Sequence, residues 1–385
     1  MPPTRVICRN YVEIEGVNVG QFHDFMLKSD YRTLGATAEL SLPLYAIGFQ
    51  KESESSTSGS TKTFGRASAR FRRVFDKVPI KVGAEVNVYC WYEGFEKIRV
   101  FHGFIEHISE GFPTKLYLRD ATFILRFGAA DKAWDSKATT QQIVSDCVGI
   151  AQKGFDEERK KLGFERPIAP LTYSNIGKNV QASTTPLSFD NFASGRSPYE
   201  IIQYLMQLLV LCAGVTDDNE VYIGAGVADN ARPVVKLDTR VNVIGSDIVK
   251  VDGRFVDYDV KVTGILSNGR RFTATGGLKT SKTADQKSGF DKVYSTPVRA
   301  STLLTTQEGI QNAADLLLQR MKGENSKGSI NTLLYPKCQL LDHVDFTDSV
   351  FEINSSKFYV IGYMFTANEE GYYQKLQVTD QVLSI

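Results

Sequence analysis

The sequence is poor in the residues that carry much of protein chemistry. Its 385 residues include only four histidines and five cysteines, and no two cysteines are spaced as C-x-x-C. An odd number of isolated cysteines argues against a disulfide framework and against a structural zinc site. It favours synthesis in a reducing compartment, which we expect to be a cytoplasm. The cysteines are Cys8, Cys90, Cys147, Cys212 and Cys338.

The sequence also lacks a surplus of charge. Lys plus Arg number 45 and Asp plus Glu number 44, so the formal net charge is +1. Non-specific nucleic-acid binding needs a large basic surplus, so the composition disfavours that function. One basic segment, RASARFRR at 66–73, fits the outward face of a strand better than a nucleic-acid site.

No long apolar run is present. The N-terminal MPPTRVICRN has no apolar core of the kind that a signal peptide needs. The most apolar stretch, YLMQLLVLCAGV at 204–215, is too short to span a bilayer and contains Gln207. We therefore expect neither a signal peptide nor membrane insertion.

Common enzyme motifs are missing as well. The sequence has no P-loop, no H-E-x-x-H, no G-x-S-x-G and no EF-hand loop. His102 and His107 would point to opposite faces of one strand, which does not suit a shared metal ion. Paired acids such as Glu369 and Glu370 lie in expected turns. We predict no catalytic residue, no cofactor and no metal site, although two carboxylates that converge in space would suffice for a glycosidase.

Strands dominate both ends of the chain. At 35–46 and 84–92 apolar and polar residues alternate, as in strands with one buried face. A hairpin is expected at 257–277, with Asn268-Gly269 supplying its turn. Polar segments at 50–63 and 276–291 are expected to be loops.

Three helices with N-terminal capping boxes interrupt the strands. In each box a Ser or Thr is followed three residues later by Glu or Gln. Gly214 is expected to end the second helix. The helices are expected at 138–152, 197–214 and 305–322.

One strand–turn–strand phrase occurs twice. GFIEHISEGFPTKLYLRD occupies 103–120 and GYMFTANEEGYYQKLQVTD occupies 362–380. Both begin with Gly and an aromatic residue, and both end in Lys-Leu-x-(Leu/Val)-x-Asp. Val-Asn-Val at 86–88 and Val-Asp-Phe at 344–346 precede them at almost the same distance. The residues that we assign to the repeat are Gly103, Phe104, Leu116, Asp120, Gly362, Tyr363, Leu376 and Asp380.

These patterns predict an α+β protein that is mainly β, with two similar small antiparallel β-barrel domains. The first barrel would span 1–129, a helical and irregular insertion 130–214, and the second barrel region 215–385. The helix at 305–322 would be embedded in the second region. Two similar modules in one chain suit symmetry matching, because a trimer presents six of them.

Several segments, in order, resemble the tail-hub (baseplate hub) proteins of long-tailed bacteriophages and contractile injection machines, including the late control protein D family. Segment 86–120 is similar to the first barrel of the family. Segment 197–224 is similar to its helix-then-strand insertion, and 308–346 to the helix that leads into its last barrel. At 341–342 this chain has Leu-Asp where the family usually has Gly-Asp. The resemblance covers most of the chain without one diagnostic motif.

The resemblance implies a structural homotrimer with a central channel, located in the virion tail and assembled in the host cytoplasm. One face would meet a six-fold tail tube or distal tail protein, and the other a three-fold spike or fibre protein. The tape-measure protein would lie in the lumen, and DNA would pass through it on ejection. A siphophage tail tip, a contractile baseplate and a tailocin all fit. No enzymatic activity is implied.

Two other functions stay open. The chain could be a peptidoglycan or glycan hydrolase that uses acidic turns. Alternatively, it could be a carbohydrate-binding receptor protein of the tail tip, with aromatic side chains stacked on sugars. The aromatic candidates are Trp91, Trp134, Tyr372 and Tyr373.

Overall fold

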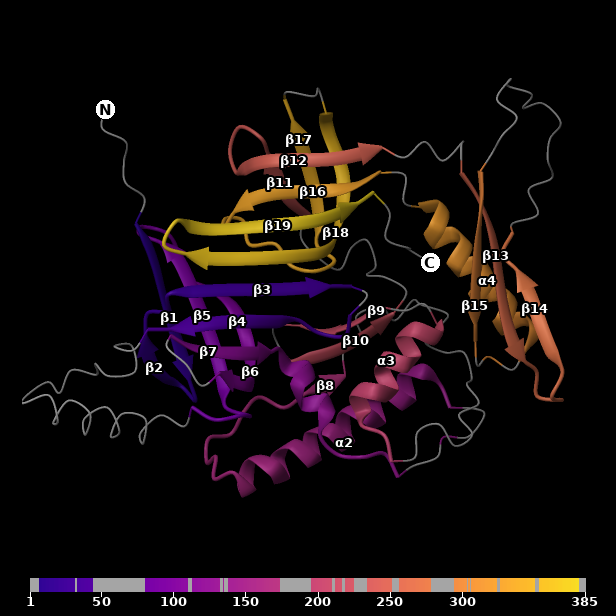
Figure 1. The fold of residues 1–385 in the computed structure, drawn as a ribbon, viewed down its shortest axis with the longest axis horizontal. Helices are drawn as coiled ribbons and strands as arrows, with labels where there is room; N and C mark the ends of the chain where they lie inside the picture. Colours follow the sequence, from indigo (N-terminus) through magenta and orange to yellow (C-terminus); the bar gives the residue numbers. More distant parts are fainter. Residues whose placement is uncertain are drawn as a thin grey trace, which may run out of the picture.

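The computed structural model describes most of the chain (Figure 1). The expected loop at 50–63 and the basic segment at 66–73 lie outside the described residues, as does 276–291 beyond Gly277. The described residues are 7–31, 33–43, 80–109, 113–131, 134, 138–173, 195–209, 212–216, 219–224, 234–250, 256–277, 294–302, 304, 306–323, 326–349 and 353–380.

The N-terminal strands form one antiparallel unit, which we call module 1. Its strands follow the order β3-β4-β7-β6-β5-β1-β2 across the sheet. Alternation builds its core: Ala38, Leu40 and Leu42 of β4 are buried, as expected for 35–46. The strands are β1 (Cys8–Ile14), β2 (Val17–Gly20), β3 (Asp24–Asp30), β4 (Thr37–Leu42), β5 (Glu85–Tyr92), β6 (Ile98–Ser109) and β7 (Thr114–Arg119).

The C-terminal strands form a second unit, module 2. Its order across the sheet is β12-β16-β19-β18-β17-β11, and only the last pair is parallel. It has a hydrophobic cluster of its own, separate from that of module 1. The strands are β11 (Val234–Asp238), β12 (Val243–Lys250), β16 (Ser326–Leu333), β17 (His343–Asp348), β18 (Ile353–Asn368) and β19 (Gly371–Thr379).

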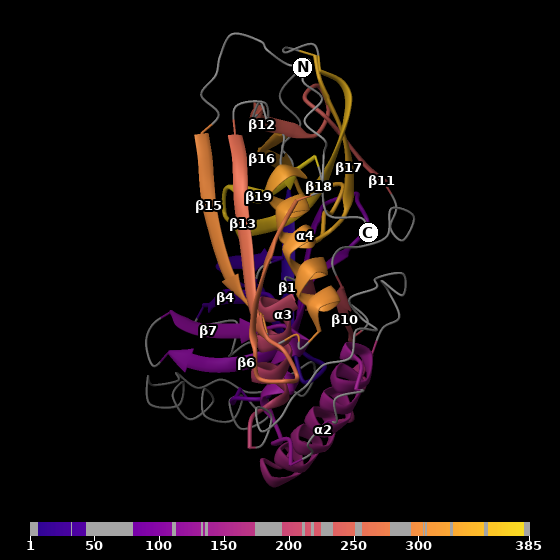
Figure 2. The same ribbon diagram turned by 90° about the vertical axis from the view of Figure 1, so that its right-hand side faces the viewer.

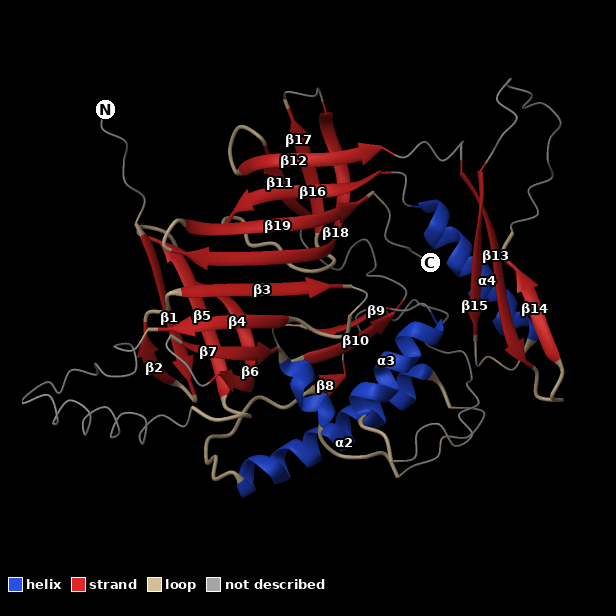
Figure 3. Cartoon of the chain, viewed as in Figure 1, coloured by secondary structure: helices blue, strands red, loops and turns tan. Residues whose placement is uncertain are grey.

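The two modules share one sheet, which corrects the expectation of two closed barrels. The mainly β, antiparallel character is confirmed, but among the described strands the shared sheet is open: it runs from β12 at one end to β2 at the other, with β17 and β11 branching from β18. The long strand β18 explains the difference. Its first part pairs with β17, and its later part, Gly362–Ala367, pairs with β3 of module 1. A strand edge that could have closed a barrel joins the modules instead (Figure 3).

A helical insertion follows module 1. Thr139 caps helix α2, accepting a hydrogen bond from the Gln142 amide at 3.2 Å, and Ser197 and Glu200 form the capping box of α3. The insertion has its own three-stranded sheet, ordered β8-β10-β9. Its elements are the 3-10 helix η1 (Ala121–Arg126), α2 (Thr140–Lys161), β8 (Thr172–Tyr173), α3 (Pro198–Leu209), β9 (Cys212–Val215) and β10 (Glu220–Gly224).

Helix α3 ends before the expected stop at Gly214. That residue lies in β9 opposite Tyr222 of β10. A Cβ at position 214 would lie 2.6 Å from the Tyr222 hydroxyl, because the buried Tyr222 side chain packs over Gly214. The apolar run at 204–215 is therefore divided between a helix and a strand.

A second insertion separates β12 from β16. It is a three-stranded sheet, β14-β13-β15, with helix α4 against it (Figure 2). The expected hairpin at 257–277 is present, with Gly269 at a φ of 78° in its turn. Thr306 accepts a hydrogen bond from the Gly309 amide at the start of α4. The elements are β13 (Val256–Ile265), β14 (Arg271–Thr275), β15 (Tyr294–Ser301) and α4 (Gln307–Gly323).

The expected embedded helix is thus present, but it covers a separate small sheet and not module 2. No helix within the described residues has the length and apolar character to cross a bilayer.

Candidate assembly surface

The two modules repeat the same arrangement of five strands. Module 1 places its strands in the order β3-β4-β7-β6-β5, and module 2 uses β12-β16-β19-β18-β17. The order along the chain agrees as well: β3, β4, β5, β6 and β7 correspond to β12, β16, β17, β18 and β19. Each neighbouring pair is antiparallel in both modules.

The registers of the repeated strands also agree. Lys28 lies opposite Thr37 in module 1, and Val249 lies opposite Lys327 at the corresponding place in module 2. The bulges coincide too. Between β6 and β7 the register shifts at Glu106, and between β18 and β19 it shifts at position 361, which corresponds to it. Pairing and irregularities therefore recur together, which indicates a duplicated module and not a chance likeness of hairpins.

In the structure, the closing halves of the two sequence phrases occupy corresponding positions, whereas the opening halves do not. Leu116 and Leu376 occupy corresponding positions, opposite Ile108 and Tyr363 respectively. Asp120 and Asp380 follow their strands at corresponding positions. The segments 86–88 and 344–346 also correspond, in β5 and β17.

The opening glycines do not correspond. Gly103 lies opposite Val86 and corresponds in register to Phe358, whereas Gly362 corresponds to His107. The sequence match at Gly plus an aromatic is thus displaced by four residues from the structural match.

Residues of the first phrase contact the helical insertion in addition to forming part of the sheet. Phe104 is fully buried and stacks at 5.8 Å on Phe123 of η1. Asp120 caps η1, accepting hydrogen bonds from the Thr122 amide at 3.1 Å and from the Ala36 amide at 2.6 Å. Desolvation outweighs these hydrogen bonds and raises the pKa of Asp120. The first copy therefore positions the helical insertion, in addition to forming the hairpin.

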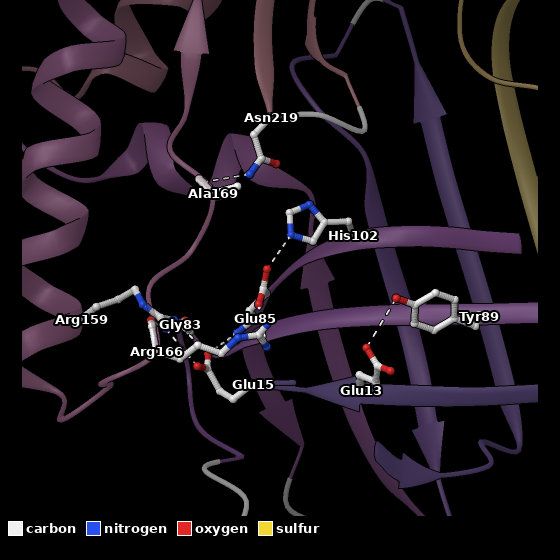
Figure 4. A network of polar contacts seen from close by, with 10 residues as sticks. All are labelled: Glu13, Glu15, Gly83, Glu85, Tyr89, His102, Arg159, Arg166, Ala169 and Asn219. Atoms are coloured by element: carbon white, nitrogen blue, oxygen red, sulfur yellow. Dashed lines mark hydrogen bonds and ion pairs between the residues drawn. The ribbon is translucent and has the colours of Figure 1, made fainter. Parts of the chain in front are cut away.

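A buried polar network fixes the insertion to module 1 (Figure 4). Near the end of α2, Arg159 donates to both carboxylate oxygens of Glu15, at 2.9 and 3.0 Å, and to the Gly83 carbonyl at 2.9 Å. Only 5% of the Arg159 side chain and 7% of the Glu15 side chain are exposed. Glu15 has a left-handed φ of 50°, so this ion pair holds the β1–β2 turn in a conformation that is rare for a non-glycine residue.

A second carboxylate continues the network. Glu85 lies 3.0 Å from His102 Nε2 and 3.2 Å from the Arg166 guanidinium. Burial opposes its ionisation, but the hydrogen bond from His102 and the nearby positive charges outweigh burial and lower the pKa of Glu85. These charges pair with one another, so the network has a structural explanation.

Two strand edges of the duplicated fold lack a described partner. β12 ends the sheet path, and β6 beyond Ile105 pairs only with β7 among the described strands. The β12 edge carries apolar side chains in water: Ile244 is 57% exposed and Val249 56%, and Val241 in the turn before β12 is 76% exposed. Sequence reasoning did not find this edge, because 241–250 carries no repeat that is visible in its letters.

The described residues offer little support for catalysis. No group of three or more His, Cys, Asp or Glu side chains among them is arranged to hold a metal ion. Burial raises the pKa of Cys147 and of Cys338 to about 12, which makes these thiols poor nucleophiles. His107 is exposed whereas 8% of the His102 side chain is exposed, so the two do not share a site.

The aromatic side chains considered for sugar binding are only partly accessible. Trp134 is 3% exposed and donates a hydrogen bond to Asp146, and Tyr372 is fully buried. Trp91 and Tyr373 are intermediate in exposure. A sugar could not stack on Trp134 or Tyr372 in this fold.

The fold is similar to those of solved tail proteins. The tail protein from Neisseria meningitidis MC58 matches with a TM-score of 0.55 and 15% identity, covering 97% of this chain and 96% of that one. The 43 kDa tail protein of prophage MuSo2 from Shewanella oneidensis matches with a TM-score of 0.56 and 15% identity, covering 97% and 98%. No family model matches the sequence, and no curated protein matches it significantly.

The chain therefore has the fold of phage tail proteins over nearly its whole length. At the level of fold, this confirms the resemblance to tail-hub proteins that the sequence indicates.

Proposed function

We propose that the protein is a structural tail hub of a phage or phage-like particle and that it works as a homotrimer. The observation that carries the proposal is the duplication: one five-strand arrangement occurs twice, with the same registers, in a chain that has the fold of phage tail proteins.

The modules are joined in a way that suits a ring. β3 of module 1 meets β18 of module 2, so corresponding modules are linked through different edges, head to tail. Repeated head-to-tail contacts produce a closed ring when the rotation per module closes. Three chains supply six modules, so a trimer combines true three-fold with approximate six-fold symmetry.

Such a ring is a symmetry adaptor. We propose that its partners are a six-fold tail tube or distal tail protein on one face and a three-fold spike or fibre protein on the other. The tape-measure protein would lie in the lumen before DNA passes through it. The work is done by interfaces, so we propose no enzymatic activity and no cofactor. The protein would assemble in the host cytoplasm and reside in the virion tail.

Native mass spectrometry over a range of protein concentrations tests the trimer. The chain mass is 42.8 kDa, and we expect a species of three times that mass to increase with concentration at the expense of the monomer. A chain that stays monomeric at every concentration, or one that forms only dimers, would contradict the proposal. Hydrolysis of purified peptidoglycan by the protein would instead favour the hydrolase alternative.

A further inference from the structure

The contact between the two modules of one chain indicates how modules of neighbouring chains meet. Within the chain, β3 pairs with β18. The repeat relates β3 to β12 and β18 to β6. If every junction in the ring is equivalent, β12 of one protomer meets β6 of the next. We infer that neighbouring protomers are joined by an antiparallel β12–β6 pairing, which continues the sheet from chain to chain. This inference rests on the proposed trimer.

Both strands are available for this pairing. β12 hydrogen-bonds to β16 along one edge, and among the described strands nothing pairs with its other edge. The pairing of β6 with β5 ends at Phe104, and hydrogen bonds to the segment before β5 end at Ile105. From His107 to Ser109, β6 pairs with β7 along one edge only, within the part of the chain that is described. Open edges of this kind readily accept a further strand.

The repeat also gives the register of the new junction. In the junction within the chain, Lys28 of β3 lies opposite Met364 of β18. Lys28 corresponds to Val249, and Met364 corresponds to Ser109, by the registers of the flanking strands. We therefore expect Val249 of one protomer to lie opposite Ser109 of the next.

One exposed apolar side chain fits this junction. Val249 is 56% exposed, on an open strand edge where natural proteins usually place charges to prevent unwanted pairing. A second copy of this chain, paired at Ser109, would cover the Val249 side chain.

Disulfide trapping tests the register. In a Cys8→Ser background, the double variant Val249→Cys/Ser109→Cys is oxidised mildly and separated without reductant. Directly opposed residues have Cα atoms about 4.5–5.5 Å apart, within the range that a disulfide spans. We expect covalent dimers and trimers, whereas each single variant should give neither. Asp247→Cys/Ser109→Cys, displaced by two residues along the same face, should give little crosslinking because diagonal neighbours are about 7–8 Å apart.

The junction within the chain supplies a matched positive control. Lys28→Cys/Met364→Cys occupies the corresponding pair and should form an intrachain disulfide, detected by peptide mass mapping, whether or not protomers assemble. A trimer that forms with Lys28–Met364 trapping but without Val249–Ser109 trapping would overturn the inferred junction and leave the hub proposal standing. A protein that is monomeric by mass at every concentration would overturn both.

Discussion

Replacing Arg159 by Met is expected to release the end of α2 from module 1. The Arg159 side chain is 5% exposed and makes two hydrogen bonds to the Glu15 carboxylate, at 2.9 and 3.0 Å. Removing one partner of a buried ion pair costs about 3–5 kcal/mol, because the remaining charge stays buried without compensation. Met keeps much of the aliphatic length of Arg159, so the loss reports the polar contacts of the guanidinium, to Glu15 and to the Gly83 carbonyl, and not a cavity.

Hydrogen exchange followed by mass spectrometry measures this loss locally. A decrease of about 3–5 kcal/mol in the opening free energy accelerates exchange by roughly two to four orders of magnitude at amides that open with this contact. We expect the acceleration in the last turns of α2 and in the β1–β2 turn. The double variant Arg159→Met/Glu15→Gln removes both charges and should recover part of the protection.

The exposed ion pair between Arg9 and Glu93 supplies the control. Their side chains are 44% and 52% exposed, so Arg9→Met should change exchange very little. Unchanged exchange in Arg159→Met, or an equal acceleration in Arg9→Met, would refute the reasoning.

Three further outcomes follow from the structure. Because the pKa of Glu85 is lowered in the folded protein, its stabilising contribution is complete above its ordinary pKa of 4.5 and is lost as the pH falls through the lowered value. Glu85→Gln should therefore reduce the midpoint of urea unfolding at pH 7. The difference in midpoint between wild type and variant should decrease on acidification, and a difference that increases would contradict this. Gly103→Ala would place a Cβ 2.2 Å from the Arg119 carbonyl oxygen and should destabilise by about 1–3 kcal/mol. Gly362→Ala meets only a side-chain end at 2.9 Å and should be milder in the same denaturation assay; equal effects would count against the reading. Val249→Glu should shift the monomer–trimer equilibrium toward monomer in sedimentation experiments, whereas Ile265→Glu, 63% exposed on another sheet, should not.

Local patterns in the sequence predicted the elements well. The N-caps at Thr139 and Ser197 and the turn at Gly269 appear as expected, because each depends on residues only a few positions apart. The mainly β character followed from alternation, which needs no knowledge of distant partners.

The sheet itself could not be predicted in this way. Whether β18 closes a barrel or pairs with β3 depends on contacts between residues more than 300 positions apart, and alternation is the same in both cases. Gly214 shows the same limit: its sequence context predicts the end of a helix, but the Tyr222 side chain that packs over it comes from another strand.

The candidate surface was only partly visible in the sequence. The Lys-Leu-x-x-x-Asp halves of the phrase led to the repeat, and the structure places Leu116 and Leu376 at corresponding positions. The opening Gly-plus-aromatic halves match in sequence, but this match is displaced by four residues from the structural correspondence. The β12 edge has no sequence signal, because its correspondence to β3 lies in pairing and not in side chains.

Electron microscopy of the purified protein at high concentration tests the central claim most directly. The hub proposal predicts a ring with three-fold symmetry, six similar lobes and an open centre. Compact single particles with no ring, at a concentration where the trimer should dominate, would contradict it.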